Sequence, residues 1–398
     1  MTHERNAWFN LWTLDPEVVH LNHGSFGAAP RVVQERQSEL RARLERDPMR
    51  FFLREYESLM DEARAKLAMF VHADPDGLVF VDNATSAVNA VLRSLPFESG
   101  DEILVTNHGY NACNNAARYA AERTGARVVV AHVPFPLAGE DDVVESILAA
   151  VSPRTRVAVI DHVTSPTALV FPIEHLVREL EQRGVDTLVD GAHALGMLPL
   201  DLDRLGAAYY TANAHKWLCA PKGAAFLHVR ADRREAVRPL VISHGANAPM
   251  RGRSRLCVEF DWTGTRDPSA WLAIPACVAF LESLMDGGIT ALMRRNHDLA
   301  ARARDRLAGT PGVSPPCPAS MLGSMAALPL PPGVVPAADP DAAMDPLQDL
   351  LEREHRITVP IIPWPAIGRL VRVSTHAYND DADIDALADA LAACVGRP

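Results

Sequence analysis

Lysine is the rarest charged residue of this chain. Among 398 residues it occurs only as Lys66, Lys216 and Lys222, so almost all of the positive charge is carried by arginine. A guanidinium stays protonated, whereas a desolvated lysine amine can lose its proton and attack a carbonyl carbon. Any chemistry that needs a neutral amine therefore has three candidate residues.

The sequence also lacks a basic excess, a long apolar run and paired cysteines. Its formal net charge is −11 at pH 7, so nucleic acid and anionic membranes are not expected as main partners. No window has the length and apolarity of a membrane span, and residues 1–20 carry charges where a signal peptide has an apolar run. The 6 cysteines are far apart, without CxxC spacing or a metal-ligand cluster. This pattern predicts reduced thiols in a cytoplasmic protein and no metal site.

Between residues 77 and 213, short apolar runs alternate with helical patterns. Such an alternation predicts an α/β fold whose parallel sheet is covered by helices on both faces. Ligands of such sheets bind at the carboxyl ends of the strands. The expected strands are 77–81, 102–106, 127–133, 156–163, 185–193 and 207–213, and the expected helices are 85–95, 111–125, 141–151 and 173–184.

The regions on either side have a different character. Residues 31–72 have helical spacing, which Asp47-Pro48 is expected to interrupt. From about residue 270 there are long Ala/Arg/Leu helices, a Pro-rich stretch at 311–340 expected to form loops and edge structure, and a short α/β tail. We therefore predict an N-terminal segment (1–30), a large domain (31–270) and a smaller C-terminal α+β domain (271–398).

Two residues that follow strand ends carry the chemical argument. Asp190 ends an apolar strand, where an ionised carboxylate is costly unless a cation faces it; a turn aspartate is the simpler alternative. Lys216 follows the 207–213 strand beside Trp217, so its amine is a candidate for desolvation, although a lone lysine is usually a surface cation. His193, close to Asp190, fits either a site residue or a buried structural histidine.

Further candidates lie nearby in the pattern. Ala84 and Thr85 open a helix after a strand, which offers amides and a hydroxyl to a phosphate, although many such turns look alike. His108 and Tyr110 follow another strand and could stack on a flat ring. Arg372 lies among apolar residues and needs an anion, either internal or from a substrate carboxylate. Together with Asp190 and Lys216, these features specify pyridoxal 5'-phosphate, whose ring nitrogen needs a carboxylate and whose aldehyde needs a lysine.

At these residues the chain resembles the class V aminotransferase family of fold-type I pyridoxal-phosphate enzymes. The segments "VDGAHALG" (189–196) and "TANAHKWLCAPKGAAFL" (211–227) are similar to the family's aspartate and lysine signatures. Four further segments look more narrowly like its isopenicillin N epimerase-like branch, which includes carbon–sulfur lyases: 18–30, 48–55, 83–92 and 261–273. The resemblance implies a large domain with a mostly parallel seven-stranded sheet and a smaller C-terminal domain.

The resemblance also assigns roles to single residues. It implies Lys216 as the Schiff-base lysine, Asp190 as the partner of the pyridine nitrogen and His193 as a neighbour of the ring hydroxyl and the lysine. It places the phosphate at Ala84, Thr85, Asn213 and His215, with Thr265 reaching the phosphate of a second subunit, so it implies a homodimer. Asn213 stands where many members have serine. The remaining implied contacts are ring stacking by Tyr110, with His108 as the alternative, the substrate carboxylate at Arg372, and the substrate mouth at Asn22 and His23.

Several reactions remain open for such a site. All begin with removal of the Cα proton of an amino-acid substrate, with Lys216 as the base. We expect β-elimination of a cysteine S-conjugate, because "LNHGSFG" (21–27) looks more like the lyase members; epimerisation of an amino-acid side chain is the alternative, and transamination follows. A desulfurase-like reaction would need a nucleophilic cysteine, for which Cys317, between prolines, is the nearest candidate. A non-catalytic binding protein is the remaining possibility, and the joint presence of Lys216, Asp190 and His193 argues against it.

Overall fold

The centre of the molecule is a seven-stranded sheet. The computed structural model describes residues 6–309, 312–330, 334, 344–365 and 367–394. The strand order is β2-β8-β7-β6-β5-β3-β4, and every strand is parallel to its neighbours except β8, which is antiparallel to both β7 and β2. The strands are β2 (Leu78–Val81), β3 (Glu102–Thr106), β4 (Arg127–Ala131), β5 (Thr155–Asp161), β6 (Asp186–Asp190), β7 (Tyr209–Asn213) and β8 (Ala225–Val229). The prediction of a mostly parallel seven-stranded sheet is confirmed.

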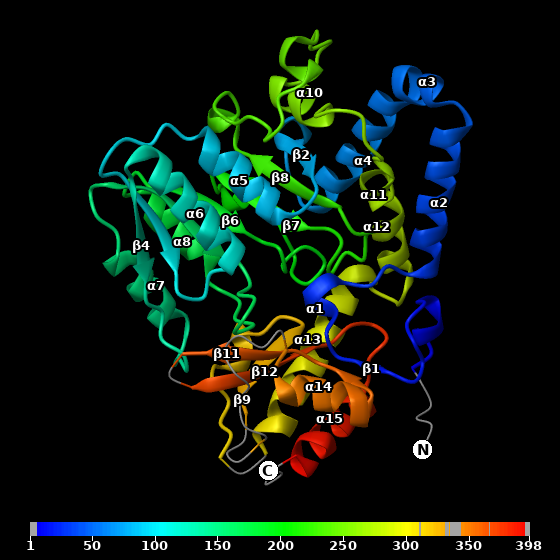
Figure 1. The fold of residues 1–398 in the computed structure, drawn as a ribbon, viewed down its shortest axis with the longest axis vertical. Helices are drawn as coiled ribbons and strands as arrows, with labels where there is room; N and C mark the ends of the chain where they lie inside the picture. The colour runs from blue at the N-terminus through cyan, green and yellow to red at the C-terminus, as the bar shows by residue number, and fades with distance from the viewer. Residues whose placement is uncertain (1–5, 310–311, 331–333, 335–343, 366, 395–398) are drawn as a thin grey trace.

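Helices cover both faces of this sheet (Figure 1). Val157 and Val159 of β5 belong to one hydrophobic cluster, whereas Ala158 and Ile160 belong to the other, as the alternation of side chains along a strand requires. The first cluster includes side chains of α5 (Ala84–Ser94), α6 (Asn111–Thr124) and α10 (Arg255–Asp261), and the second includes those of α7 (Glu140–Ala149), α8 (Ile173–Glu181) and α9 (Leu202–Leu205). Because both faces of the inner strands are buried, those strands are mostly apolar, whereas the edge strand β4 is partly exposed.

The N-terminal helices run along one side of the sheet. They are α2 (Arg31–Arg46), α3 (Pro48–Arg50), a π-helical turn (Phe51–Glu55) and α4 (Tyr56–Phe70). The expected interruption at Asp47-Pro48 is confirmed: Asp47 leaves the helical conformation, and its carboxylate accepts a hydrogen bond from the backbone N–H of Arg50. The helices α11 (Ser269–Leu272) and α12 (Ile274–Ser283) contact α2 and α4.

A smaller sheet lies at the opposite end of the molecule (Figure 1). Its antiparallel order is β11-β12-β9, with β9 (Met325–Pro329), β11 (Ile361–Trp364) and β12 (Gly368–Ser374). The helices α13 (Gly288–Ala308), α14 (Pro346–His355) and α15 (Asp381–Ala393) accompany it. The described part of 311–340 agrees with the expected edge structure, since β9 is an edge strand; residues 310–311, 331–333 and 335–343 lie outside the described residues. The N-terminal β1 (Val19–His20) pairs in parallel with β10 (Ile357–Thr358), and the domain boundaries at residues 30 and 270 stay predictions.

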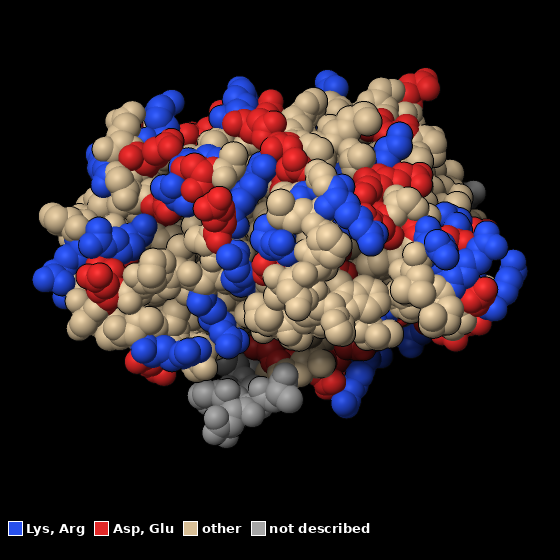
Figure 2. Space-filling model, turned by 90° about the horizontal axis from the view of Figure 1, so that it is seen from above, with Lys and Arg blue, Asp and Glu red and all other residues tan. Residues whose placement is uncertain are grey.

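The surface carries charges of both signs. Arginine and lysine are interspersed with aspartate and glutamate on the face seen in Figure 2, around an uncharged area. Among the described helices none alone is long and apolar enough to cross a membrane; Ser269–Ser283 and Gly288–Ala308 qualify only as a pair, bent by 71°. All cysteines are buried. A cytoplasmic location stays a prediction.

Candidate active site

Asp190 and Lys216 meet at the carboxyl edge of the large sheet. Asp190 is the last residue of β6, and Thr211 lies beside it on β7, five residues before Lys216. The Asp190 carboxylate is buried; its Oδ1 accepts from the backbone N–H of Ala192 at 2.9 Å and its Oδ2 from the thiol of Cys113 at 3.1 Å. Sequence reasoning gave no role to Cys113, which reaches this site from α6.

The residue after Asp190 has no room for a side chain. A Cβ added at Gly191 would lie 2.3 Å from the hydroxyl oxygen of Tyr210, so any side chain would displace either the buried Tyr210 ring or the turn that orients the carboxylate. A second carboxyl group, that of Asp161, lies directly across from Asp190 at the end of β5. Burial, followed by the charge of Asp190, raises the pKa of Asp161 well above its usual range. Asp161 therefore favours its neutral form, and it was missed in the sequence.

The Lys216 amine lies beside an imidazole. Its Nζ is 3.0 Å from Nε2 of His193, and Nδ1 of the same ring accepts from the indole N–H of Trp217 at 3.2 Å. Burial, followed by the charge of Arg372, lowers the pKa of Lys216 to about 8. Burial, followed by the charge of Lys216, also lowers the pKa of His193 well below its usual value. His193 therefore favours its neutral form, and the Lys216 amine loses its proton more readily than an ordinary lysine does.

Fewer backbone amides than expected are available to bind an anion at the N-terminus of α5. The amide of Ala84 is occupied by Oδ1 of Asn213 at 2.8 Å, and the amide of Ser86 by Oδ1 of Asn83 at 2.8 Å. Within the described residues, the amide and hydroxyl of Thr85 have no hydrogen-bond acceptor. The structure thus places Asn213 as a brace for the helix start and leaves Thr85 as the open donor for a phosphate.

His215 lies next to Lys216 and points one nitrogen at the protein. Its Nδ1 is 2.9 Å from the carbonyl oxygen of Ala224, so Nδ1 carries the proton and donates. Nε2 is then the atom left for a phosphate, and it can donate only when the ring is charged. Burial lowers the pKa of His215 to about 4, so a charged His215 requires the phosphate itself as its counter-ion.

The two candidates for ring stacking differ in their accessibility. His108 is fully buried; its Nδ1 is 2.7 Å from the Thr167 hydroxyl and its Nε2 3.1 Å from the Val133 carbonyl oxygen. Its ring also packs against Trp364 of the small domain at 4.7 Å between centroids. Tyr110 is 45% exposed. Tyr110 is therefore the candidate whose ring is open to a ligand, and His108 is a packed element behind it.

Arg372 is a buried guanidinium without a carboxylate partner in the described part of the chain. It lies on β12; Nη1 donates to the carbonyl oxygen of Ser165 at 2.6 Å and Nη2 to the hydroxyl of Ser25 at 2.9 Å, while Nε has no acceptor. Burial lowers the pKa of Arg372 to about 10. The Ser25 hydroxyl in turn donates to Oδ1 of Asn22 at 2.5 Å. Ser25 and Ser165 were missed in the sequence, which singled out only Asn22 and Arg372.

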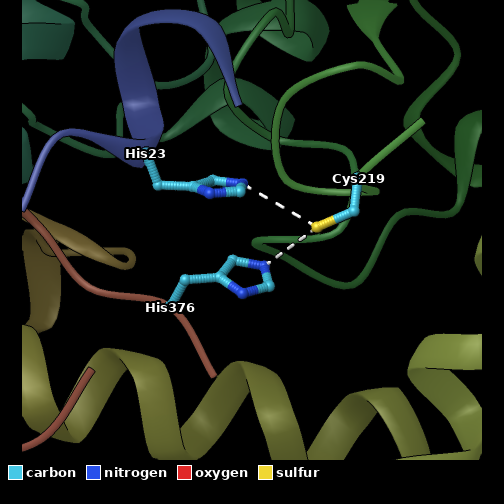
Figure 3. A group of neighbouring side chains, drawn as sticks. All are labelled: His23, Cys219 and His376. Carbon is cyan, nitrogen blue, oxygen red and sulfur yellow. Dashed lines mark hydrogen bonds between the residues drawn. The ribbon is translucent and has the colours of Figure 1, made fainter. Parts of the chain in front are cut away.

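The structure places His23, expected at the substrate mouth, in a buried cluster with Cys219 and His376 (Figure 3). Its Nδ1 is 2.8 Å from the Tyr378 hydroxyl and its Nε2 3.0 Å from the backbone carbonyl oxygen of Lys216. His376 stacks on its ring at 4.2 Å, and the Cys219 thiol lies 3.4 Å from Nε2 of His376. Because both nitrogens of His23 are engaged, this cluster holds the lysine backbone rather than facing the substrate.

The N-terminal segment also closes onto the lysine turn through α1 (His23–Phe26). Gly27, which follows α1, has φ +68°, and a Cβ there would lie 1.9 Å from the carbonyl oxygen of His215. Its own carbonyl oxygen accepts from Lys222 at 2.9 Å, so Lys222 holds the segment in place. Thr265 is exposed. Cys317 is buried, and burial raises its pKa to about 11, so the exposed reactive thiol considered from its proline neighbours is not present.

These residues together fit pyridoxal phosphate. The amine of Lys216 can hold an aldehyde, and the carboxylate of Asp190 can face a ring nitrogen. Thr85 and His215 can hold a phosphate, and Tyr110 has an open ring face. Arg372 retains a buried Nε without an acceptor, which a substrate carboxylate could satisfy.

Comparisons with known proteins agree with this geometry. The family model "Aminotransferase class-V" matches residues 27–387. The chain is 39% identical to isopenicillin N epimerase from Amycolatopsis lactamdurans over 97% of this chain and 98% of that protein. It is 31% identical to a probable chloroplastic L-cysteine desulfhydrase from Arabidopsis thaliana over 95% of this chain and 83% of that protein. A solved cystine C–S lyase with its product cysteine persulfide has a TM-score of 0.81 at 23% identity, covering 95% of this chain and 98% of that one.

Proposed function

The chain belongs to the class V aminotransferase family of pyridoxal-phosphate enzymes, and we propose that it eliminates the sulfur substituent of a cysteine S-conjugate. The observation that carries the proposal is the pairing of two groups. A lysine amine with a lowered pKa lies 3.0 Å from a neutral histidine, and the buried Arg372 lacks a carboxylate partner in the described residues. The first supplies a base, and the second supplies a seat for the α-carboxylate of an amino acid.

Each residue has a separate task in this proposal. Arg372 binds the substrate carboxylate, with Ser25 and Ser165 fixing its guanidinium. Bound pyridoxal phosphate supplies an electron sink that makes the Cα proton acidic. Asp190 holds the ring nitrogen of the cofactor, and Lys216 takes the proton from Cα.

The proposed reaction balances without an oxidant. The Cα–H bond breaks and its proton passes to the Lys216 amine; the Cβ–S bond breaks and the sulfur leaves with the bonding electrons. A proton returns to the sulfur to give a thiol, and water hydrolyses the remaining three-carbon fragment to pyruvate and ammonia. Elimination needs one base only, and Lys216 supplies it.

The segment 21–27 supports the lyase reaction over the alternatives. It resembles lyase members in sequence, and in this chain its Ser25 hydroxyl contacts Arg372 while His23 contacts the carbonyl oxygen of Lys216. Epimerisation is the second candidate, because a relative named isopenicillin N epimerase is 39% identical over 97% of this chain. Epimerisation additionally requires a proton donor on the opposite face of Cα.

The test asks first whether the protein binds the cofactor, and then whether it eliminates or epimerises its substrate. Purified protein supplied with pyridoxal phosphate is expected to absorb at about 420 nm, and Lys216→Ala to lose that band. Incubation with cysteine S-conjugates in heavy water should then release pyruvate and a thiol. Recovery of deuterated substrate with inverted configuration and no pyruvate would instead assign the epimerase reaction. A protein without the band would contradict both.

We propose that the working unit is a homodimer with Thr265 near the site of the partner subunit. Support comes from a row of exposed apolar side chains, Leu240, Val241 and Ile242, with 40%, 56% and 61% of their surfaces exposed. Sedimentation of the cofactor-loaded protein should give a dimer mass, and Ile242→Glu should shift it toward the monomer. A monomer that is fully active would contradict this assembly.

A further inference from the structure

The hydrogen bond between Trp217 and His193 has a fixed direction. An indole N–H can donate but cannot accept, so Nδ1 of His193, at 3.2 Å, must be the acceptor. A neutral imidazole carries its single proton on the other nitrogen, which is Nε2. Burial keeps His193 neutral, since its pKa lies well below the usual value. The tautomer of His193 is thus set by a residue adjacent to the lysine.

The direction of this bond decides the state of the lysine. Nε2 of His193 lies 3.0 Å from Nζ of Lys216. If Nε2 carries the proton, it donates, and Nζ must offer a lone pair. An ammonium group has three donors and no acceptor, so the pair is satisfied only when the lysine is a neutral amine.

We propose that Trp217 is a positioning residue that fixes His193 as the Nε2–H tautomer and thereby favours the neutral amine of Lys216. This inference rests on the proposed function for its purpose, because a neutral amine is what the base and the cofactor link require. Its geometry does not depend on that function. Phenylalanine would fill the same buried position but would leave Nδ1 without a donor.

The surroundings hold the indole in place. Trp217 is fully buried, and its ring lies 5.1 Å from that of His23 and 6.0 Å from that of His376, the latter in a stacked arrangement. These rings leave the indole N–H aimed at His193. The charged and titratable groups that face Lys216 or His193 are Arg372, Asp190, Asp161, Cys113, His23 and His215.

The scarcity of lysine makes a direct test practicable. With three lysines in the chain, carbon-13 labelling at lysine Cε gives three signals, and Lys216→Arg identifies the one that matters. In the cofactor-free full chain, Trp217→Phe should raise the pKa of Lys216 by about one unit, because Nε2 can then accept from an ammonium group. The rate of pyridoxal phosphate uptake near neutral pH should fall about tenfold, as the neutral fraction does.

A matched control removes a different buried indole N–H. Trp12 is 1% exposed and donates from Nε1 to the carbonyl oxygen of Ala28 at 3.0 Å. Trp12→Phe should leave the lysine pKa and the uptake rate unchanged. Circular dichroism confirms that each variant is folded before it is compared.

Nitrogen-15 labelling of histidine tests the tautomer without any substitution at Trp217. The wild-type chain should show His193, identified by its loss in His193→Gln, with the proton on Nε2. The glutamine variant should keep the low lysine pKa, because an amide oxygen can accept from Trp217 and its NH2 can donate to Lys216. A wild-type His193 protonated on Nδ1, or a Trp217→Phe chain with an unchanged lysine pKa, overturns the proposal. Neither measurement uses substrate turnover, so a failure of the proposed reaction is separately visible.

Discussion

Arg64 and Arg372 are equally buried, with 4% of each exposed, yet their guanidinium groups have opposite surroundings. Arg64 donates to Asp261 at 2.5 Å and to the carbonyl oxygen of Leu78 at 2.6 Å. Within the described residues, Arg372 donates to serine oxygens only and keeps one N–H without an acceptor. Burial lowers the pKa of both, but the charge of Asp261 raises that of Arg64 above its usual value, whereas that of Arg372 falls to about 10. The comparison separates a completed structural ion pair from a cation whose counter-ion we expect to be substrate.

The largest expected effect is on the buried ion pair between Arg64 and Asp261. Arg64→Met leaves the buried Asp261 carboxylate with Arg253 as its one remaining basic partner among the described residues. We expect the free energy of unfolding to fall by about 3 kcal/mol, because a buried carboxylate loses its main counter-ion. Urea unfolding followed by circular dichroism measures the loss, and KM for substrate should not change. Normal stability in this variant would remove the contrast between the two arginines.

The opposite pattern is expected at Arg372. Arg372→Met should raise KM for the amino acid about 100-fold, because the carboxylate loses a charged, directional donor. The free energy of unfolding should change by less than about 1 kcal/mol, since no internal carboxylate is left unpaired. Arg369→Met on the same strand is the matched control, because Arg369 pairs with Asp345 at 2.9 Å. An unstable Arg372 variant with unchanged KM would make Arg372 structural as well.

Lys216 extends the comparison to a second buried basic group whose pKa is lowered, as that of Arg372 is. Its pKa is about 8 in the folded chain against 10.5 in the reference state. Below pH 8 the Lys216 amine is protonated in both the folded and the unfolded chain, so the folded chain bears the full cost of burying the charge. Between pH 8 and pH 10.5 the unfolded chain binds more protons than the folded chain, and the free energy of unfolding of the wild type therefore rises with pH. Lys216→Met should therefore stabilise the cofactor-free chain by about 2 kcal/mol at pH 7, after allowance for solvent screening.

The pH dependence supplies the check on that gain. The gain in the free energy of unfolding of Lys216→Met over the wild type should shrink between pH 8 and pH 10.5 and vanish at higher pH. Lys66→Met, on an exposed position of α4, should show no such trend in denaturant unfolding. A gain that persists unchanged at high pH would mean that packing, not charge, is responsible.

The central part of this site was predictable from the sequence because it depends on strand order. Asp190 ends one apolar strand and Lys216 follows another, and adjacent parallel strands end at one edge, so their proximity follows from the alternation. β8 was not placed because its short apolar run follows the lysine turn without a helix between them, outside the alternating pattern.

What the sequence could not supply are contacts made across the whole chain. Ser25 and Ser165 lie 347 and 207 residues from Arg372, and no local pattern marks a serine as a guanidinium acceptor. The family resemblance assigned His23 to the substrate mouth and gave His108 as the alternative to Tyr110 for ring stacking. Both are buried with both ring nitrogens hydrogen-bonded, which only tertiary packing reveals.

The smallest expected effect concerns the hydrogen bond from Arg372 to Ser25. Ser25 accepts from Nη2 of Arg372 at 2.9 Å and donates to Asn22 at 2.5 Å. Ser25→Ala should raise KM about fivefold with kcat unchanged, because one hydrogen bond that orients the guanidinium is lost while the charge of the guanidinium remains. Steady-state kinetics measures both parameters, with Ser38→Ala at an exposed position of α2 as the control. A fall in kcat at constant KM would connect Ser25 to the lysine side of the site. Arg64 and Arg372 would then differ only in the charge of their acceptors, because the serines would no longer be part of the binding site for the substrate carboxylate.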